Sequence, residues 1–217
     1  MTERAWLTPV AGFVEPRVQD EFPGLRLDWV TGEARPRASP PALVQRLREL
    51  SSRYRGGSVV AMRTKPIPQA FRVFFRQIGL DPDVTRVPSE HAAVARLLHG
   101  GFRSLGLIAD ACLVALIETG VPVWALDADV VGEGGLGIRT AGPEALAPGA
   151  AGGLQLAPGS LAVADRRVLH AQLFGDPAPG HGVGRGTERV TLFAVAVDGV
   201  PAIHVEEALW LVVEMLR

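Results

Sequence analysis

The chain has 217 residues, a formal net charge of −1, 47% hydrophobic residues and 21% charged residues, which is typical of a soluble globular protein with one sizeable core. The near-neutral charge excludes a global basic surface that would bind nucleic acid tightly, although a local basic patch remains open. The single cysteine, Cys112, excludes an internal disulfide. Because no signal-like N-terminus and no apolar run of about 18 residues is present, we expect a cytoplasmic protein without a membrane partner.

The first hundred residues predict three short strands and three helices. Alternating apolar residues favour strands, and proline at a first turn with glycine after the last turn favours helices. We expect Ser39 and Ser89 to cap two of the helices. The predicted elements are strands at 11–14, 25–30 and 59–63 and helices at 40–54, 68–79 and 89–98.

The stretch from Ser104 to Ala141 carries few charges and predicts one packed unit of a helix, a turn and two strands. Apolar residues recur near helical spacing over 105–118, and Gly120 followed by Pro122 predicts the end of the helix. Strands are expected at 121–126 and 136–140, joined by a turn-rich connection.

The last quarter of the chain predicts more strand and one final helix. A hairpin is expected at 160–164 and 168–174, followed by a glycine- and proline-rich loop at 175–186. The almost wholly apolar run at 189–197 favours a central strand, and Pro201 opens a helix through Leu216. We therefore predict a mixed α/β (α+β) single domain over 1–217, with a mixed sheet flanked by helices.

Motifs for cofactors and metals are weak in this sequence. The run GEGGLG at 132–137 fits G-x-G-x-x-G, but a predicted strand follows where a helix N-terminus is needed, so we interpret it as a β-connection. The five histidines and the lone cysteine lack metal-ligand spacing, and no nucleophile elbow or phosphate loop is present. We expect no cofactor and no metal.

The loop at 175–186 is a candidate binding or catalytic segment. Its glycines let backbone N–H groups approach a phosphate or carboxylate closely, while His181 and Arg185 supply charge. Thr187 follows directly. The alternative interpretation is a hairpin tip without function.

Other candidate residues sit at the ends of predicted strands. Arg63 and Lys65 leave the strand at 59–63, either facing a phosphate or simply solvated. Asp127 and Asp129 follow the strand at 121–126, where an aspartate has a structural role in a turn more often than a catalytic one.

The segment 104–127 resembles the B3/B4 domain of the bacterial phenylalanyl-tRNA synthetase beta subunit and its free-standing relatives. The pattern P-I-N-N-x-V-D-x-T-N-Y-x-x-x-E-x-G-x-P-L-H-A-F-D aligns without a gap. The matching residues are Asp110, Glu118, Gly120, Pro122, Ala125 and Asp127. Arg139 before Thr140 also follows the family pattern, and the segment 75–100 is similar to the free-standing relatives. The resemblance covers about 63–200, preceded by N-terminal strands and a helix over 1–62 and followed by a helix over 201–217.

The resemblance implies the editing-domain fold and an association with tRNA, since this domain of the synthetase hydrolyses mischarged tRNA. The polar residues of the family's editing pocket are replaced here. The Thr-Asn pair falls on Cys112 and Leu113, the histidine on Trp124, the late glutamate near Phe193, and the tandem asparagines on Gly106 and Leu107. The sequence therefore matches the scaffold residues of the family but not the polar residues of its editing pocket. An apolar pocket does not orient a water molecule by itself.

Two functions of different class follow from these observations. The first is an aminoacyl-tRNA deacylase, an ester hydrolase that edits mischarged tRNA in trans with Glu118, Thr187 or His181 as catalytic groups. The second is a non-catalytic module that binds RNA or a small ligand. A third, weaker alternative is a subunit whose partner supplies the charge and chemistry. The expected partner is tRNA, not DNA, and the candidate binding residues are Arg63, Lys65, Trp124, Asp127, Arg139 and Arg185.

Overall fold

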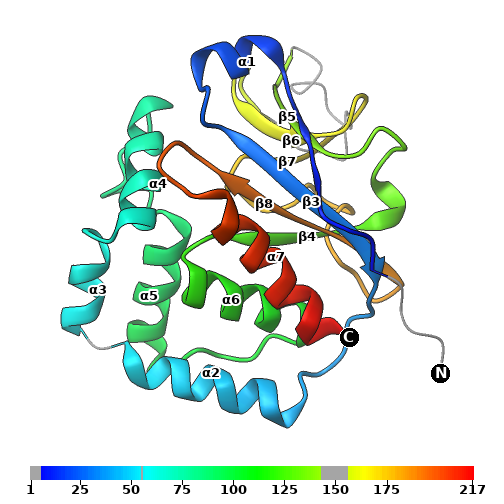
Figure 1. The fold of residues 1–217 in the computed structure, drawn as a ribbon. Helices are drawn as coiled ribbons and strands as arrows, with labels where there is room; N and C mark the ends of the chain where they lie inside the picture. Colours follow the sequence, from blue (N-terminus) through cyan, green and yellow to red (C-terminus); the bar gives the residue numbers. More distant parts are fainter. Residues whose placement is uncertain (1–5, 55, 143–155) are drawn as a thin grey trace. The chain divides into compact units, whose positions relative to one another are not determined.

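The computed structural model describes residues 6–54, 56–142 and 156–217, which form a mixed α/β structure (Figure 1). The predicted fold class is confirmed. The chain divides into two compact units: Met1–Pro36 with Trp124–Ala194, which we call the sheet unit, and Arg37–Val123 with Val195–Arg217, which we call the helical unit. Each unit is assembled from two separate segments of chain. The expectation of a single domain stays a prediction.

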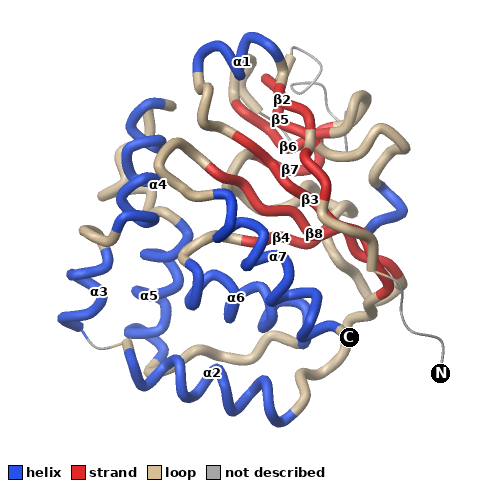
Figure 2. Tube along the Cα trace, in the orientation of Figure 1, coloured by secondary structure: helices blue, strands red, loops and turns tan. Residues whose placement is uncertain are grey.

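The strands of the sheet unit form two four-stranded sheets, with orders β1-β3-β8-β4 and β2-β5-β6-β7 (Figure 2). The first contains β1 (Val10–Ala11), β3 (Arg26–Glu33), β8 (Arg189–Ala196) and β4 (Val123–Asp127). The second contains β2 (Phe13–Val14), β5 (Gly137–Thr140), β6 (Leu161–Ala164) and β7 (Leu169–Gln172). The short helix α1 (Pro16–Glu21) follows β2, and the 3₁₀ turn η1 (Ala128–Val130) follows β4.

The apolar run predicted as a central strand is β8, which lies between β3 and β4. Every β8 residue after Arg189 is buried, as expected for a strand covered on both faces. The predicted hairpin is also present, because β6 and β7 pair antiparallel with Val163 opposite Ala171. Residues 132–137 lead into β5, so the glycine-rich run is a β-connection as predicted.

The helical unit contains α2 (Pro41–Arg53), α3 (Gly56–Met62), α4 (Pro66–Gln77), α5 (Pro88–His99), α6 (Leu107–Thr119) and α7 (Ala202–Leu216). Helix α6 packs against α2 and α7 (Figure 1), which explains why it is apolar around most of its circumference. It ends at Gly120, whose φ of 79° is the predicted left-handed stop. No helix within the described ranges is both long and apolar enough to cross a membrane.

The strand predicted at 59–63 is wrong, because this segment is helix α3. Two adjacent valines favour a strand, but a strand needs a neighbouring strand for its backbone hydrogen bonds, and α3 packs beside the helix α5. The burial pattern fits a surface helix, since Val60 is 70% exposed whereas Met62 is 3% exposed.

The two predicted serine caps are also wrong. The hydroxyl of Ser39 donates to the Asp110 carboxylate at 2.6 Å, and Pro40 occupies the N-cap position of α2. Ser89 lies inside the first turn of α5, where Val87 is the N-cap residue. Asp110 is 1% exposed and also accepts from the Ser104 hydroxyl and from the Leu105 N–H, so it anchors the entry to α6.

A buried ion pair joins α4 and α5. The guanidinium of Arg72 lies 3.0 Å from the Glu90 carboxylate, and the two side chains are 6% and 2% exposed. Arg72 also contacts Asp83 at 2.9 Å. Burial opposes the charge of Arg72, but hydrogen bonds from Arg72 to Asp83 and Glu90 outweigh it and raise the pKa of the guanidinium. This network links α4 to α5 through paired charges.

Candidate functional site

A carboxylate and two histidines form a row in the sheet unit, which we call the Asp165–His170–His181 row. Asp165 follows β6, His170 lies on β7, and His181 lies in the loop that precedes β8. Nε2 of His170 is 3.2 Å from Oδ2 of Asp165, and Nδ1 of His170 is 3.0 Å from Nδ1 of His181. The second contact is a hydrogen bond, whereas the first places the carboxylate beside Nε2 of His170 without the full geometry of a hydrogen bond.

Burial and backbone contacts set the charge of the row. Asp165 and His170 are 4% and 0% exposed, and His181 is half-buried. Burial lowers the pKa of both histidines below the ordinary value, and the nearby negative charge of Asp165 opposes this effect. The histidines are therefore neutral at pH 7.

Asp165 keeps its negative charge although burial opposes it. Its Oδ1 accepts hydrogen bonds from the N–H groups of Arg167 and Val168 at 2.7 and 2.6 Å, and its Oδ2 accepts one from Gly132 at 2.9 Å. These three donors outweigh the desolvation and lower the pKa of the carboxyl. The ionised carboxylate is thus fixed in place beside His170.

The 3.0 Å contact between the two rings fits either histidine as the donor, and the position of the carboxylate favours one arrangement of the protons. A neutral imidazole carries one N–H, and the Asp165 carboxylate favours that proton on Nε2 of His170. Nδ1 of His170 then accepts from Nδ1–H of His181, which leaves the lone pair of His181 on Nε2. No described residue makes a hydrogen bond to this Nε2. A neutral histidine with a free lone pair can take a proton from water.

Hydrogen bonds hold the loop that carries His181 to Asp127 at the end of β4. The backbone N–H of Asp127 donates to the carbonyl of His181 at 3.0 Å, and the Thr187 hydroxyl donates to Oδ2 of Asp127 at 2.6 Å. The same hydroxyl accepts from the N–H of Gly184 at 3.0 Å. Since Thr187 is 2% exposed and both roles of its hydroxyl are used, this geometry favours a positioning role for Thr187 and Asp127.

The other predicted residues of the sheet unit lie on its strands and in this loop. Trp124 on β4 stacks on Phe193 of β8, with ring centroids 5.5 Å apart, and makes a tilted contact with Phe174 at 6.0 Å. Arg139 on β5 is half-buried, and its positive charge helps to lower the pKa of His170. Arg185 is exposed in the turn that ends at Thr187.

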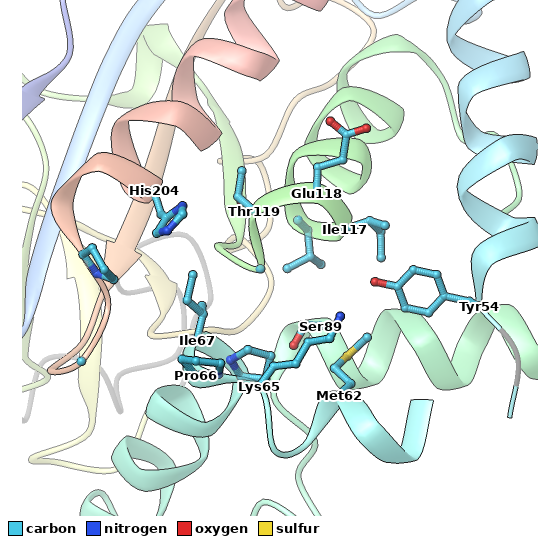
Figure 3. A pocket seen from close by; sticks show the side chains of 15 residues that line it. Tyr54, Met62, Lys65, Pro66, Ile67, Ser89, Ile117, Glu118, Thr119 and His204 are labelled. Carbon is cyan, nitrogen blue, oxygen red and sulfur yellow. The ribbon is translucent and has the colours of Figure 1, made fainter. Parts of the chain in front are cut away.

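The remaining candidates, Arg63, Lys65 and Glu118, belong to the helical unit. Arg63 lies 3.1 Å from Asp83 and 3.5 Å from Glu90, so it completes the network around Arg72. Glu118 makes a two-point contact with Arg46 at 2.5 and 3.1 Å. Lys65 and Glu118 both line a cavity of about 340 Å³, but the Glu118 carboxylate points away from its centre (Figure 3).

Sequence reasoning missed Asp165 and His170. The hairpin predicted at 160–164 and 168–174 contains Asp165 in its turn and His170 on its second strand, but neither pattern indicates a site. The predicted hairpin could have indicated that Asp165 and His170 lie close together, because pairing of β6 with β7 brings the residue after β6 close to the start of β7. Among the described residues, no group of three or more histidine, cysteine, aspartate or glutamate side chains has the arrangement of a metal site.

Comparison with protein-family models gives no match for this chain, and comparison with curated proteins gives none either.

Proposed function

We propose that the chain is an aminoacyl-tRNA deacylase that hydrolyses the ester of mischarged tRNA in the cytoplasm, with His181 as its general base. The observation that carries this proposal is the Asp165–His170–His181 row, in which a buried carboxylate orients one neutral histidine and that histidine orients a second. Carboxylate–histidine arrangements of this type activate oxygen nucleophiles in hydrolases. Ester hydrolysis needs such a base and a water molecule.

In the proposed reaction, Nε2 of His181 removes a proton from water as the water oxygen attacks the ester carbonyl carbon. The bond between that carbon and the ribose oxygen breaks, and His181 returns the proton to the ribose oxygen. The products are the free amino acid and the tRNA 3′ end. Asp165 and His170 stabilise the positive charge that His181 carries between the two steps, because the carboxylate remains ionised throughout.

The choice of substrate rests on the resemblance of 104–127 to the synthetase editing domain. The net charge of −1 implies that tRNA binding is weak and falls steeply with salt, because few phosphate contacts are available. Arg185 and Arg139 are the cations of the sheet unit that we assign to phosphate contacts, and Trp124 offers a flat apolar face.

The proposal is tested by measuring deacylation of a panel of mischarged tRNAs at low salt. We expect hydrolysis of one or a few species, with a loss of at least about 100-fold in His181→Gln, the usual size of a general-base contribution. His91→Gln, which changes an exposed histidine on α5, is the matched control and keeps full activity. Absence of turnover across the panel would refute the deacylase.

Two further variants in the same panel separate the candidate catalytic groups. Thr187→Ala should reduce the rate less than His181→Gln, since Thr187 holds the loop and does not contact the substrate in this proposal. Glu118→Gln should leave the rate unchanged, since Glu118 is held by Arg46. A large loss of deacylation rate in Glu118→Gln alone would indicate that the catalytic site lies in the helical unit and not at His181.

A non-catalytic binding module is the second candidate. It is favoured by the apolar residues that replace the polar groups of the family's editing pocket, above all Trp124 and Phe193, which stack on each other in the sheet unit. In this case uncharged and charged tRNA bind with similar affinity, no species is hydrolysed, and Trp124→Ala weakens binding while His181→Gln does not.

A further inference from the structure

The cavity of the helical unit is lined by both apolar and polar side chains (Figure 3). Its volume of about 340 Å³ lies in the range of pockets that enclose small organic molecules. The apolar lining residues include Met62, Ile67, Leu116 and Ile117, and the polar groups belong to Tyr54, Lys65, Ser89 and His204. All of these residues belong to the helical unit.

Lys65 is the only lysine in the chain, and the other basic residues are arginines and histidines. It lies at the N-cap position of α4 and lines the cavity. Among the described residues that line the cavity, it carries the one charge without an ion-pair partner, since Glu118 is paired with Arg46 and His204 lies 3.3 Å from Glu207. The cavity therefore presents one uncompensated positive charge.

Ser89 supplies a second, independent feature. It lines the same cavity and is 4% exposed, and its Oγ has no hydrogen-bond partner among the described residues. A buried hydroxyl without a partner is unfavourable, so an acceptor atom of a ligand at this position would remove that cost.

The helix ends around the cavity have a polarity that favours an anion. The first turns of α4, α5 and α7 contribute Ile67, Ser89 and His204 to its lining, and the N-terminal end of a helix carries partial positive charge. Helix α6 ends at the same cavity and contributes the opposite polarity, which is reduced where its carbonyls at Ala115 and Leu116 accept from the Thr119 hydroxyl and the Gly120 N–H.

We propose that this cavity binds a small carboxylic acid with an apolar body, with the carboxylate held by Lys65 and Ser89. The carboxylate provides the counter-charge for Lys65 and the acceptor for Ser89, while the apolar body contacts Met62, Ile67 and Ile117. Tyr54, whose hydroxyl points into the cavity (Figure 3), is a further donor, because burial raises its pKa and keeps it protonated.

The presence of a single lysine makes the proposal directly measurable. Reductive methylation of the intact protein modifies the amine of Lys65 and the N-terminal amine, and peptide mass spectrometry reports each one. A saturating concentration of 3-phenylpropanoate should slow methylation of Lys65 by about fivefold while the N-terminal amine reacts unchanged. The isosteric 3-phenylpropanamide should not protect Lys65. Equal protection by the acid and the amide, or protection by neither, overturns the proposal.

Variants test the two proposed contacts by calorimetric titration with the same acid. Lys65→Met should weaken binding by about tenfold, and Ser89→Ala by about threefold. Arg76→Met, which removes an exposed cation from the last turn of α4, is the matched control and should leave the affinity unchanged. Unchanged affinity in Lys65→Met overturns the proposal. Because these variants leave the Asp165–His170–His181 row intact, a failure here is distinguishable from a failure of the deacylase.

Discussion

At the scale of single residues, burial and nearby charges set the protonation states of Asp165, His170 and His181. Asp165 keeps a charge at 4% exposure because three backbone N–H groups surround it, and His170 and His181 stay neutral because burial outweighs the attraction of Asp165. Cys112 is the contrasting case, since burial raises the pKa of its thiol to about 12 and makes it unreactive. Within the described ranges, the row thus places two neutral histidines beside a buried, ionised carboxylate.

The pH dependence of stability follows from the same residues. Because the pKa values of His170 and His181 are lowered on folding, the unfolded chain binds more protons below about pH 6.5, so stability falls as pH falls through that value. The lowered pKa of Asp165 adds a further loss only at more acidic pH, as the carboxylate protonates. Urea unfolding at pH 7.5, 6.5 and 5.5 should therefore give progressively lower midpoints. A constant urea midpoint from pH 7.5 to 5.5 would contradict the lowered pKa values of His170 and His181.

Asp165→Asn should destabilise the protein by about 2 kcal/mol, since it removes the charge that three backbone N–H groups now stabilise. The measurement is urea unfolding at pH 7.5. Asp176→Asn is the control, because Asp176 is exposed in the following loop and should change stability little. A similar effect of the two substitutions would show that the backbone contacts to Asp165 contribute little.

At the scale of elements, helix ends determine several features of the helical unit. Gly100 and Gly120 end α5 and α6 in the left-handed conformation, at φ values of 73° and 79°. The N-terminal turns of α4, α5 and α7 line the proposed carboxylate cavity. Proline starts α2, α4 and α5 at a first-turn position, where its missing N–H costs nothing.

The two glycine stops give a matched pair of substitutions. Gly100→Ala should cost about 1–2 kcal/mol, the penalty of a left-handed conformation for a residue with a Cβ atom, because that Cβ would meet no neighbour. Gly120→Ala should cost more, because its Cβ would lie 3.2 Å from Cγ2 of Ile67. Thermal unfolding of the two variants measures the difference. Equal losses would mean that Ile67 moves aside freely.

At the scale of the whole molecule, the boundary at 36/37 falls in the connection between β3 and α2, but the other two boundaries between the units fall inside strands. The boundary at 123/124 falls within β4 and the boundary at 194/195 falls within β8, so two strands continue from one unit into the other. Because each of these strands belongs in part to both units, unfolding of one unit disrupts a strand of the other. We therefore expect the chain to unfold in one cooperative transition, in agreement with the single domain predicted from the sequence.

This expectation is tested with one substitution in each unit. Arg72→Met in the helical unit leaves Glu90 buried without its closest partner and should cost about 3 kcal/mol. Asp165→Asn acts in the sheet unit. In one cooperative protein, both substitutions shift the same calorimetric peak, and fluorescence and circular dichroism report coincident midpoints. Two separated transitions, each sensitive to one substitution, would show independent domains.

Much of the secondary structure was predictable from local patterns. The apolar run of β8, the glycine after α6 and the turn between β6 and β7 each act through their own neighbours in sequence, so periodicity and backbone preference were sufficient. The strand predicted at 59–63 failed because a short valine-rich run suits a strand or a helix, and only its neighbour α5 decides between them.

The sequence by itself determined the fold class and the loop that carries His181, because these depend on residue type and local order. It predicts Lys65 at the exit of a strand, whereas the structure has Lys65 at the N-cap position of helix α4. Only the tertiary structure decided that Asp165, His170 and His181 form a row, that Asp127 and Thr187 fasten the loop, and that Lys65 and Ser89 line one cavity. The physical reason is distance. Burial, charge and hydrogen bonding act over a few ångströms in space, and residues far apart in the chain come that close only after it has folded.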